Sequence, residues 1–370
     1  MIKFLKSALR SIGLDKVIYK INLNYNFKYT LYRKKIFLEI NNKIIDSTQT
    51  TKLSKYFIDN LYNYFDLNKK KNFTSVKESM WNEISDSFYK NIFSLIEIDR
   101  KNFTKVLDDP GEYNLHWGFD DNCKDLKKKY KSIFMKQYKF SIIDRLISFC
   151  EYISVLKTHH PATSSLFSNN KIDIDDLIIK IENKLKIKLN FKNVFPGERG
   201  LQTAKGILVY KEIQALYNAL KINEIIKYKN LKDIKILEIG GGLGRTAYYC
   251  NKFGIKNYTM IDILLPSISQ ANYLARSINE DSILLVDEIS KSHQLNRIKI
   301  STPDKLLSNN NYFDILFNSD SFVEMDHENQ KNYVDYIKKN SNLFISINHE
   351  SLKFSVFELF KKTKYKKYQK

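Results

Sequence analysis

The stretch Ile234-Lys-Ile-Leu-Glu-Ile-Gly-Gly-Gly-Leu-Gly-Arg-Thr-Ala-Tyr-Tyr249 decides the fold of the chain. Its first six residues are rich in isoleucine and predict a buried strand, and Gly240-Gly-Gly-Leu-Gly244 then turns the chain into a helix. Glycine is needed where backbone turns tightly or approaches a ligand without a Cβ. A strand, a glycine-rich turn and a helix in this order are typical of the ligand-binding edge of an α/β sheet.

Strands and helices alternate after this stretch. The pattern predicts a doubly wound, mostly parallel, Rossmann-like α/β sheet of five strands, preceded by a mainly helical N-terminal region. Ligands of such sheets bind at the carboxyl ends of the strands, so the functional residues are expected just after each strand. The strands are predicted at Ile234–Ile239, Tyr258–Ile261, Ser282–Val286, Phe313–Asn318 and Leu343–Ile347, with helices at Gly244–Phe253, Pro266–Ile278, Ile289–Ile298 and Gln330–Lys339.

The chain divides into three consecutive zones by pattern. Residues 1–70 form a mixed extension with an expected hairpin between Tyr25 and Ile45, and 71–190 form a mainly helical region suited to a substrate or lid domain. Residues 191–370 form the sheet domain, which an amphipathic helix from Ala204 to Ile226 introduces.

Composition excludes several classes of protein. Apolar residues make up 43% of the 370 residues, which is enough to bury a core and rules out wholesale disorder. Eleven Gly and five Pro rule out collagen-like and linker sequences. The cysteines Cys123, Cys150 and Cys250 are too few and too scattered for a disulfide framework or a zinc module, so a reducing cytoplasm is expected.

The net charge of +20 suggests a nucleic-acid partner, but the residues behind it do not. Only eight of the 61 basic residues are Arg, the side chain that nucleic-acid readers use for bidentate contacts. The abundance of Lys with Asn, Ile, Tyr and Phe fits a coding bias towards A and T. Residues 231–350 carry −2, whereas 1–230 carry +16 and 351–370 carry +6, so an anionic partner would meet the N-terminal part or the C-terminal tail, and no nucleic acid is expected.

The chain shows no membrane-spanning segment or signal peptide in its sequence. No apolar run approaches the roughly 20 residues of a membrane span, and Lys3, Lys6 and Arg10 interrupt any signal-peptide core. The apolar residues among the first 18 fall near helical spacing with bases between them. This pattern fits a helix that packs on its own domain or one that lies on an anionic membrane surface, so peripheral membrane contact through the basic N-terminus stays open.

The glycine turn fits two kinds of cofactor. Gly242-x-Gly244-x-x-Ala247 matches a dinucleotide fingerprint, which would place a pyrophosphate on the helix N-terminus. Glu238-x-Gly240-x-Gly242-x-Gly244 matches the turn that holds S-adenosylmethionine. The Glu238 carboxylate would repel a pyrophosphate but suits a cationic sulfonium, so S-adenosylmethionine is the expected cofactor. A plain turn without a ligand is the third alternative.

The run from Ile236 to Tyr249 resembles the first motif of class I S-adenosylmethionine-dependent methyltransferases. With three later stretches it is similar to the sugar O-methyltransferase family of bacteria, over about 191–350 well and 72–190 loosely. The resemblance implies a cytoplasmic enzyme that methylates a sugar hydroxyl in a capsule or lipopolysaccharide precursor. The stretches are Tyr258-Thr-Met-Ile-Asp262, Phe313-Asp-Ile-Leu-Phe-Asn-Ser-Asp-Ser-Phe-Val-Glu-Met325 and Phe344-Ile-Ser-Ile-Asn-His-Glu350, with Asn114-Leu-His-Trp-Gly-Phe-Asp120 upstream.

The end of the chain departs from this family. Class I sheets end with an antiparallel hairpin of two strands, but only Tyr365 to Gln369 remains here after a helix predicted at Phe354–Thr363. One edge strand is therefore expected to be absent.

Methyl transfer to an alcohol needs a donor held in line with the attacking oxygen and a base for the hydroxyl proton. The methionine part of the donor is expected along Glu238, Gly240, Gly242 and Gly244. The ribose is expected at Asp262, and Asp287 is the candidate for the adenine amine or a solvated loop residue.

The catalytic candidates follow the fourth and fifth strands. His349 is favoured as the base because an imidazole titrates nearest neutrality. Asp320 and Glu324, four residues apart, are expected to bind sugar hydroxyls, and surface roles are the alternative for all three. No metal site is predicted, although Asp320 and Glu324 carry the oxygen ligands that a divalent cation would use.

The acceptor is expected to contact Arg199, Trp117 and Glu350. Arg199 would bind a phosphate or carboxylate, and Trp117 would stack on a sugar face, with a salt bridge and core packing as the alternatives. The partner is a sugar, a nucleotide sugar or a glycan precursor, and the oligomeric state is not predicted. A nucleic-acid methyltransferase and a catalytically silent glycan-binding protein of the same fold are the alternative functions.

Overall fold

The computed structural model describes residues 40–69, 84–129, 133–157, 172–285, 296–304, 311–348 and 356–360. The chain forms two compact units that alternate along the sequence. One comprises 1–45, 130–190 and 200–210, and the other comprises 46–129, 191–199 and 211–370. No helix in the described part of the chain is long and apolar enough to cross a membrane.

The smaller unit combines two helices with most of a three-stranded sheet. The helices are α9 (Ile133–Tyr152) and α10 (Ile174–Leu185), and Asp173 caps α10 by accepting hydrogen bonds from two backbone amides of its first turn. The sheet runs in the order β1 (Ile44–Asp46), β2 (Arg199–Thr203) and β3 (Gly206–Leu208).

The prediction that a helix begins at Ala204 is wrong. Strands β2 and β3 form an antiparallel hairpin that pairs Leu201 with Leu208, and Thr203 Oγ1 donates to the carbonyl of Gly206 across the turn. Gly206 takes a φ of +111°, which glycine adopts without strain. The helix that follows, α11 (Tyr210–Tyr228), begins six residues later than predicted.

Short helices precede the sheet of the larger unit. They are α4 (Lys55–Asn68), a π-helical turn η2 (Ser85–Tyr89), α6 (Lys90–Ile96), α7 (Arg100–Asp108) and α8 (Lys124–Lys129). The carbonyl of Leu107, at the end of α7, accepts a hydrogen bond of 2.8 Å from the Asn272 side chain, and Asp108 pairs with Arg276. These contacts with α13 (Leu264–Ser277) fix the start of the loop that joins α7 to α8.

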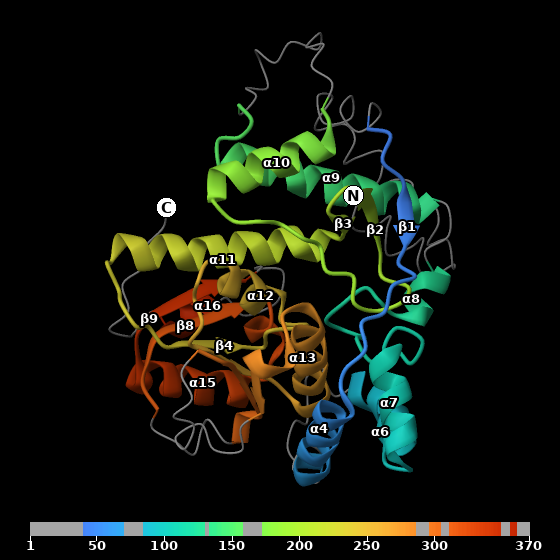
Figure 1. Cartoon of the computed structure of the whole chain (residues 1–370). Coiled ribbons are helices and arrows are strands. Elements are labelled where there is room, and N and C mark those ends of the chain that lie inside the picture. Colours follow the sequence, from blue (N-terminus) through green and yellow to red (C-terminus); the bar gives the residue numbers. More distant parts are fainter. Residues whose placement is uncertain are drawn as a thin grey trace, which may run out of the picture. The chain divides into compact units, whose positions relative to one another are not determined.

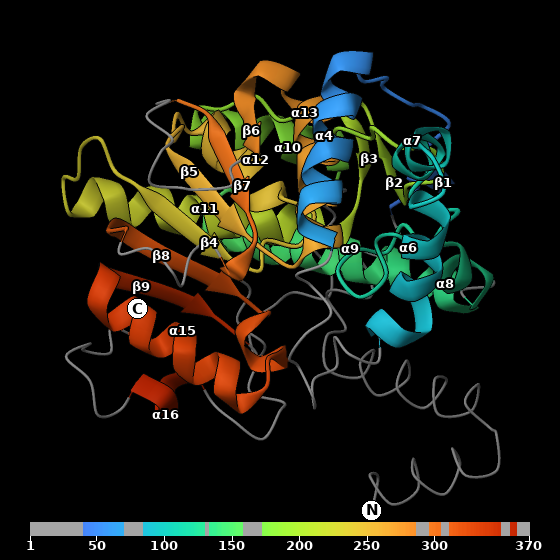
Figure 2. The same ribbon diagram turned by 90° about the horizontal axis from the view of Figure 1, so that it is seen from below.

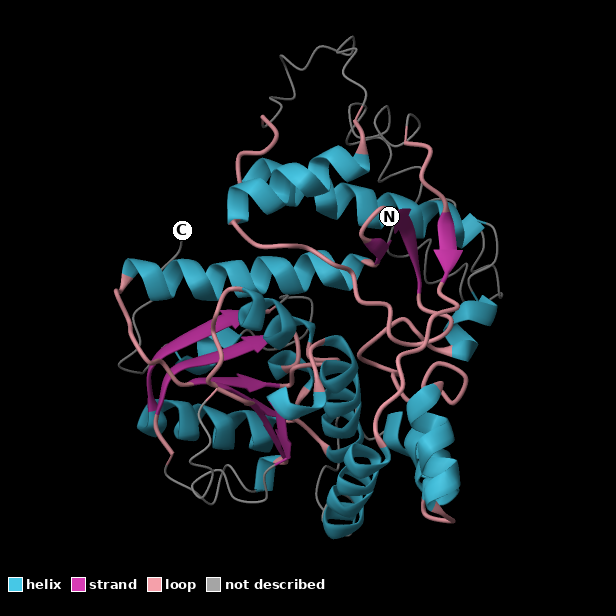
Figure 3. Cartoon of the chain, in the orientation of Figure 1, coloured by secondary structure: helices cyan, strands magenta, loops and turns pink. Residues whose placement is uncertain are grey.

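A six-stranded, all-parallel sheet forms the core of this unit, and Figure 3 shows its strands in magenta. Its strand order is β6-β7-β5-β4-β8-β9. The strands are β4 (Ile236–Ile239), β5 (Tyr258–Ile261), β6 (Ile283–Leu285), β7 (Ile298–Ser301), β8 (Phe313–Ser319) and β9 (Ser341–Ile347), with the short 3₁₀ turns η3 (Glu280–Ser282) and η5 (Phe322–Glu324). The α/β fold with a mostly parallel sheet is therefore confirmed.

The predicted number of strands is wrong by one. Ile298 to Ser301 form β7, which pairs with both β5 and β6, so the helix predicted to end at Ile298 cannot extend that far. The strand beside β5 is β7 and not the predicted third strand, β6. The residues at the ligand edge next to β5 are consequently those after Ser301, and Asp287 lies outside the described residues.

Helices cover both faces of the sheet. Figure 1 shows α11 and α12 (Arg245–Lys252) on one side and α15 (His327–Asn340) on the other, and Figure 2 shows α16 (Val356–Phe360) next to α15, with which it shares one apolar cluster. Leu237 and Leu316 pack with Ile337 of α15 in one buried apolar cluster. Among the described elements, β6 and β9 are the two edge strands, and Tyr365 to Gln369 lie outside the described residues.

The order of the strands reverses beside β4. The chain moves from β4 to β5 on one side and returns to β8 on the other, pairing Leu237 with both Thr259 and Leu316. Helices on opposite faces diverge at such a point and leave a crevice at the carboxyl ends of the strands. The glycine-rich turn begins there.

A substitution at Gly240 tests how closely the glycine turn approaches Ser321. Its φ is +70°, and a Cβ added there would overlap the Ser321 side chain, whereas Gly254 has a φ of +83° with open space around it. Both Gly240→Ala and Gly254→Ala should therefore cost about 1–2 kcal/mol of backbone strain. Gly240→Ala should cost at least about 1 kcal/mol more because of the overlap. Urea unfolding of the two variants measures this difference, and equal losses would contradict the close approach.

Candidate functional site

A cavity of about 520 Å³ lies at the carboxyl ends of β4, β5, β7 and β8. The glycine turn forms its floor, and the residues after β5, β7 and β8 contribute acids. One face of α11 closes one wall through Lys211, Gln214, Ala215 and Asn218, and the loop before α8 adds Gly118 and Phe119. All of these segments belong to the larger unit.

The glycine turn brings backbone, rather than side chains, to the cavity. Gly240 and Gly242 both line it and have positive φ angles of +70° and +56°. Gly244, which was predicted to contact the cofactor, caps α12 and does not line the cavity. A Cβ at Gly244 would lie 3.1 Å from Leu274, so this glycine lets α12 pack against α13.

Glu238, at the end of β4, is a buried acid that lines the cavity. Its side chain is 2% exposed and accepts a 3.1 Å hydrogen bond from the Tyr258 hydroxyl. Burial raises the pKa of this carboxyl to about 8, with a further contribution from Asp262, although the hydrogen bonds from Tyr258 and Thr246 oppose the shift. Glu238 is therefore ready to ionise when a cation arrives.

Asp262 follows β5 and also lines the cavity. Its carboxylate accepts hydrogen bonds from the Ile263 amide at 2.9 Å and from Gln270 Nε2 at 2.8 Å. Gln270 also donates to the Gly242 carbonyl, so it fixes the acid to the turn. Burial raises the pKa of Asp262 to about 7, and the Glu324 carboxylate adds to the shift.

The residues after β8 form a network that joins three strands. The Asn318 amide donates to the Ile239 carbonyl at 2.7 Å and to Ser321 Oγ at 2.6 Å, and the Asn348 amide donates to Asn318 Oδ1 at 2.9 Å. Ser321 Oγ in turn donates to the Ile239 carbonyl. The amide group of Asn318 is thus occupied by hydrogen bonds to other residues of the protein.

Asp320 projects from this network into the cavity. Its φ is +61°, in the left-handed region that Asp tolerates better than most residues. Gln214 Nε2 of α11 donates a 2.7 Å hydrogen bond to Asp320 Oδ2. Glu324, on the 3₁₀ turn that follows, lines the same cavity, so the two predicted acids do meet at one site.

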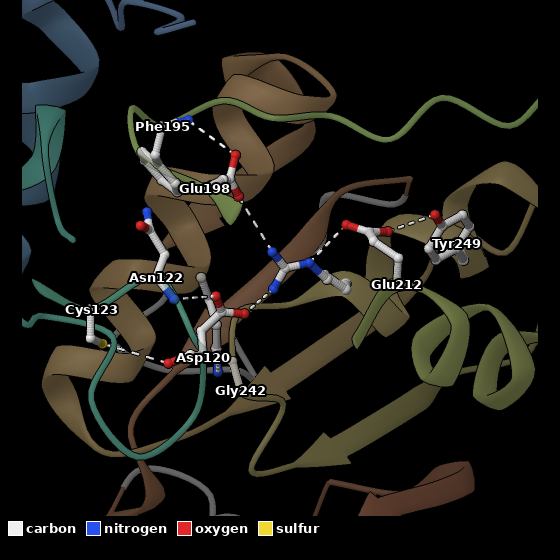
Figure 4. Close-up of polar contacts among 10 residues, drawn as sticks. Asp120, Asn122, Cys123, Phe195, Glu198, Glu212, Gly242 and Tyr249 are labelled. Carbon is white, nitrogen blue, oxygen red and sulfur yellow. Dashed lines mark hydrogen bonds and ion pairs between the residues drawn. The ribbon is translucent and has the colours of Figure 1, made fainter. Parts of the chain in front are cut away.

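A buried ion cluster lies behind the glycine turn. Arg245, at the start of α12, is 5% exposed and lines the cavity. It pairs with Asp120, with Glu212 at 2.7 Å and with Glu198 at 3.4 Å. Figure 4 shows these three carboxylates, from three different segments, pointing toward one guanidinium. The cluster therefore holds two loops and α11 against α12.

Asp120 and Glu198 differ in protonation. Burial alone would raise the pKa of Asp120, but Arg245 lowers it below its usual value. Burial raises the pKa of Glu198 to about 8 in spite of Arg245, so Glu198 is mostly neutral at pH 7. The guanidinium thus faces one firmly ionised and one mostly protonated carboxyl group on two different loops.

The loop before α8 contributes backbone to the cavity and aromatic side chains to the core. His116 is completely buried, neither ring nitrogen has a hydrogen-bond partner among the described residues, and burial lowers its pKa to about 4. Trp117, a predicted acceptor contact, stacks on Phe88 with ring centroids 4.1 Å apart and does not line the cavity.

Of the other predicted acceptor residues, Arg199 forms a two-pronged ion pair with Asp46 at 2.6 and 2.7 Å and does not line the cavity. This is the salt-bridge alternative that the sequence left open. His349, Glu350 and Asp287 lie outside the described residues. No group of three or more acids, histidines or cysteines in the described ranges has the geometry of a metal site.

The charge of the cavity is opposite to that of the chain. Among the described residues, six acidic side chains line it against two bases, Lys211 and Arg245. Arg245 is already paired with three further carboxylates. The acids are Glu238, Asp262, Asp304, Asp320, Glu324 and Asp326. A site of this charge favours a cationic ligand and opposes phosphates.

Comparison with known proteins does not identify a relative. No protein-family model matches the chain, and no curated protein is detectably similar to it in sequence. The function therefore has to be argued from the cavity.

The ion cluster yields a paired prediction. Glu198→Gln should leave the free energy of unfolding at pH 7 within about 1 kcal/mol of the parent, because it replaces a mostly protonated carboxyl group. Asp120→Asn should lose about 3 kcal/mol, because it removes an ionised partner of a buried guanidinium. Chemical denaturation measures both changes.

The difference in stability between the parent protein and Glu198→Gln should depend on pH. A buried acid whose pKa is raised costs stability as pH rises from its unfolded value of about 4.5 to its folded value of about 8, above which the loss stays constant. The stability of the parent should therefore fall relative to that of Glu198→Gln over this pH range. A constant difference between the two proteins from pH 5 to 9 would show that Glu198 is ionised throughout.

Proposed function

We propose that the chain is an S-adenosylmethionine-dependent O-methyltransferase that acts on a sugar hydroxyl, in the synthesis of a capsule or lipopolysaccharide precursor. The observation that carries the proposal is an acidic cavity at the end of β4, with a glycine-rich floor and Glu238 and Asp262 at its wall. The sequence motifs that resemble class I methyltransferases occupy these positions.

The chemistry of the cavity suits this donor. The ligand has a sulfonium and an ammonium, which carboxylates stabilise, and a ribose, whose two hydroxyls an acid after the second strand can accept. Glu238 lies on the side of the turn expected for the cationic part, and Asp262 is held by Gln270 where it can accept hydroxyls. The positive φ angles of Gly240 and Gly242 keep Cβ atoms out of the floor.

The rival cofactor and the rival enzyme are both disfavoured by charge. A dinucleotide would place two phosphate groups in a lining where acids outnumber bases, and one of those bases, Arg245, already pairs with three acids. A nucleic-acid acceptor would bring phosphates toward the same acids.

S-adenosylmethionine would supply an electrophilic methyl group. The chain's part of the reaction is to orient the acceptor hydroxyl and to take its proton. His349 remains the proposed base, and Asp320 and Glu324 are proposed to hold sugar hydroxyls. Gln214 positions Asp320 through a single hydrogen bond to Oδ2, which leaves Oδ1 for the acceptor.

Isothermal calorimetry tests the donor site. Asp262→Ala should weaken the binding of S-adenosylmethionine or S-adenosylhomocysteine by about 10–100-fold, because two charge-assisted hydrogen bonds are lost. Asp335→Ala, which removes an acid of α15 that does not line the cavity, should stay within about twofold of the parent. No binding by the parent protein at millimolar ligand would refute the proposed function.

Donor binding should also depend on pH. Glu238 and Asp262 have pKa values of about 8 and 7 without ligand, and a cation favours their ionised forms. The affinity should therefore rise from pH 6 to 8, by up to about tenfold per pH unit for each proton released. Calorimetry in buffers of different ionisation enthalpy counts the protons released on binding. Ligand binding to the Glu238→Gln variant should release fewer protons than binding to the parent protein.

Activity assays separate the three candidate functions. Transfer of labelled methyl groups should be seen with sugars, nucleotide sugars or lipid-linked glycans and not with tRNA or DNA. Loss of turnover in His349→Ala with intact donor binding would support the base assignment, and full turnover in that variant would refute it. Donor binding without transfer to any glycan acceptor would favour a catalytically silent glycan-binding protein.

A further inference from the structure

Tyr333 lines the cavity from α15, a helix to which no motif of the sequence assigns a role. Figure 1 shows α15 on the side of the sheet opposite to α11. The Tyr333 side chain belongs to the buried apolar cluster that contains Ile239 and Ile261, the last residues of β4 and β5. Tyr333 is therefore anchored beside the ends of the two strands that present the donor acids.

The Tyr333 hydroxyl is a hydrogen-bonding group that the protein itself does not use. The residue is 5% exposed, and its hydroxyl has no hydrogen-bond partner among the described residues. By contrast, the hydroxyls of Tyr258 and Tyr336 donate to Glu238 and to the Asn311 carbonyl. A buried tyrosine normally finds a partner for its hydroxyl, and on a cavity wall a ligand can supply it.

Two acids of the cavity lie close enough to act on this hydroxyl. Burial raises the pKa of Tyr333, and the carboxylate of Asp262 adds to the shift more than that of Asp304 does. The phenol therefore keeps its proton and remains a hydrogen-bond donor. Asp262 accepts hydrogen bonds from Ile263 and Gln270 but not from Tyr333, so the phenol and this acid face the same part of the cavity without joining.

We propose that Tyr333 donates a hydrogen bond to the same ribose hydroxyl that donates to Asp262, so that the two side chains together select a ribonucleoside. A sugar hydroxyl both donates and accepts, so it can satisfy the acid and the phenol at once. A deoxyribose would leave both groups without a partner, and a site built around a hydroxyl rejects a ligand that lacks it. This inference rests on the proposed function, because the ribose belongs to the proposed donor.

Calorimetry with S-adenosylhomocysteine and with its 2′-deoxy and 3′-deoxy forms tests the proposal. Tyr333→Phe removes only the hydroxyl and should weaken the binding of S-adenosylhomocysteine about fivefold, the effect of one neutral hydrogen bond. One of the two deoxy ligands lacks the hydroxyl that Tyr333 contacts, and it should bind to the parent and to Tyr333→Phe within about twofold. This coupling between side chain and ligand is a result that a merely structural role would not produce.

Tyr336→Phe is the matched control on the same helix. Tyr336 donates a 2.9 Å hydrogen bond to the Asn311 carbonyl and does not line the cavity. Its substitution should leave the affinity for all three ligands within about twofold of the parent, even if the lost hydrogen bond lowers the melting temperature. Thermal melting of both variants shows that each is folded at the temperature of the binding experiment.

The failure of this inference is distinguishable from that of the proposed function. If S-adenosylhomocysteine does not bind to the parent protein, the proposed function fails. If it binds, the role of Tyr333 is overturned by any of three results: unchanged affinity in Tyr333→Phe, a similar loss of affinity for S-adenosylhomocysteine and for both deoxy ligands, or an equal loss in Tyr336→Phe.

Discussion

The buried Arg245 guanidinium is the interaction on which the arrangement of the larger unit depends. It is held by carboxylates from the loop before α8, the loop before β2 and α11, while Arg245 itself opens the helix that follows the glycine turn. Desolvating these charges is costly unless they remain together. The cluster therefore fixes the walls of the cavity relative to its floor, and any movement of one wall exposes unpaired charge.

Hydrogen bonds at the ends of the strands provide the complementary constraint. Asn318, Ser321 and the Ile239 carbonyl tie β8 to β4, and Gly240 allows the approach because it lacks a side chain. Gln270 connects Asp262 to the turn in the same way. The acids of the cavity are thus presented by a rigid edge, as preorganised binding of a small ligand requires.

The sequence predicts the parts of the site that depend on local pattern. Strand β5 lies where the pattern placed it, and Glu238, Asp262, Asp320 and Glu324 meet because the carboxyl ends of parallel strands share one edge. Strand β7 was missed because the sequence predicts a helix over Ile289–Ile298, which ends on the first residue of this strand. The hairpin at Gly206 was missed because apolar residues after Ala204 continue a helical spacing that the turn interrupts.

Residues brought to the site by tertiary packing could not be predicted in this way. Gln214 and Asn218 lie outside every quoted motif, and nothing in the glycine-rich run predicts the ion pairs of Arg245; the roles of all three follow from where α11 and α12 lie on the sheet. Arg199 and Trp117 looked suited to an acceptor, but Asp46 and Phe88 occupy their side chains. The choice between a salt bridge and a ligand contact depends on a partner that lies far away in the sequence.

The contrast between an acidic cavity and a chain of net charge +20 has a kinetic consequence. At 0.01 M salt, where the Debye length is about 30 Å, an approaching cation meets the positive field of the whole molecule, and only near the mouth of the cavity does it feel the acids. Its approach is slowed at low ionic strength, while its departure from the acids is slowed as well. Added salt would therefore quicken both association and dissociation of a cationic ligand, so that rate constants change more than the equilibrium between them.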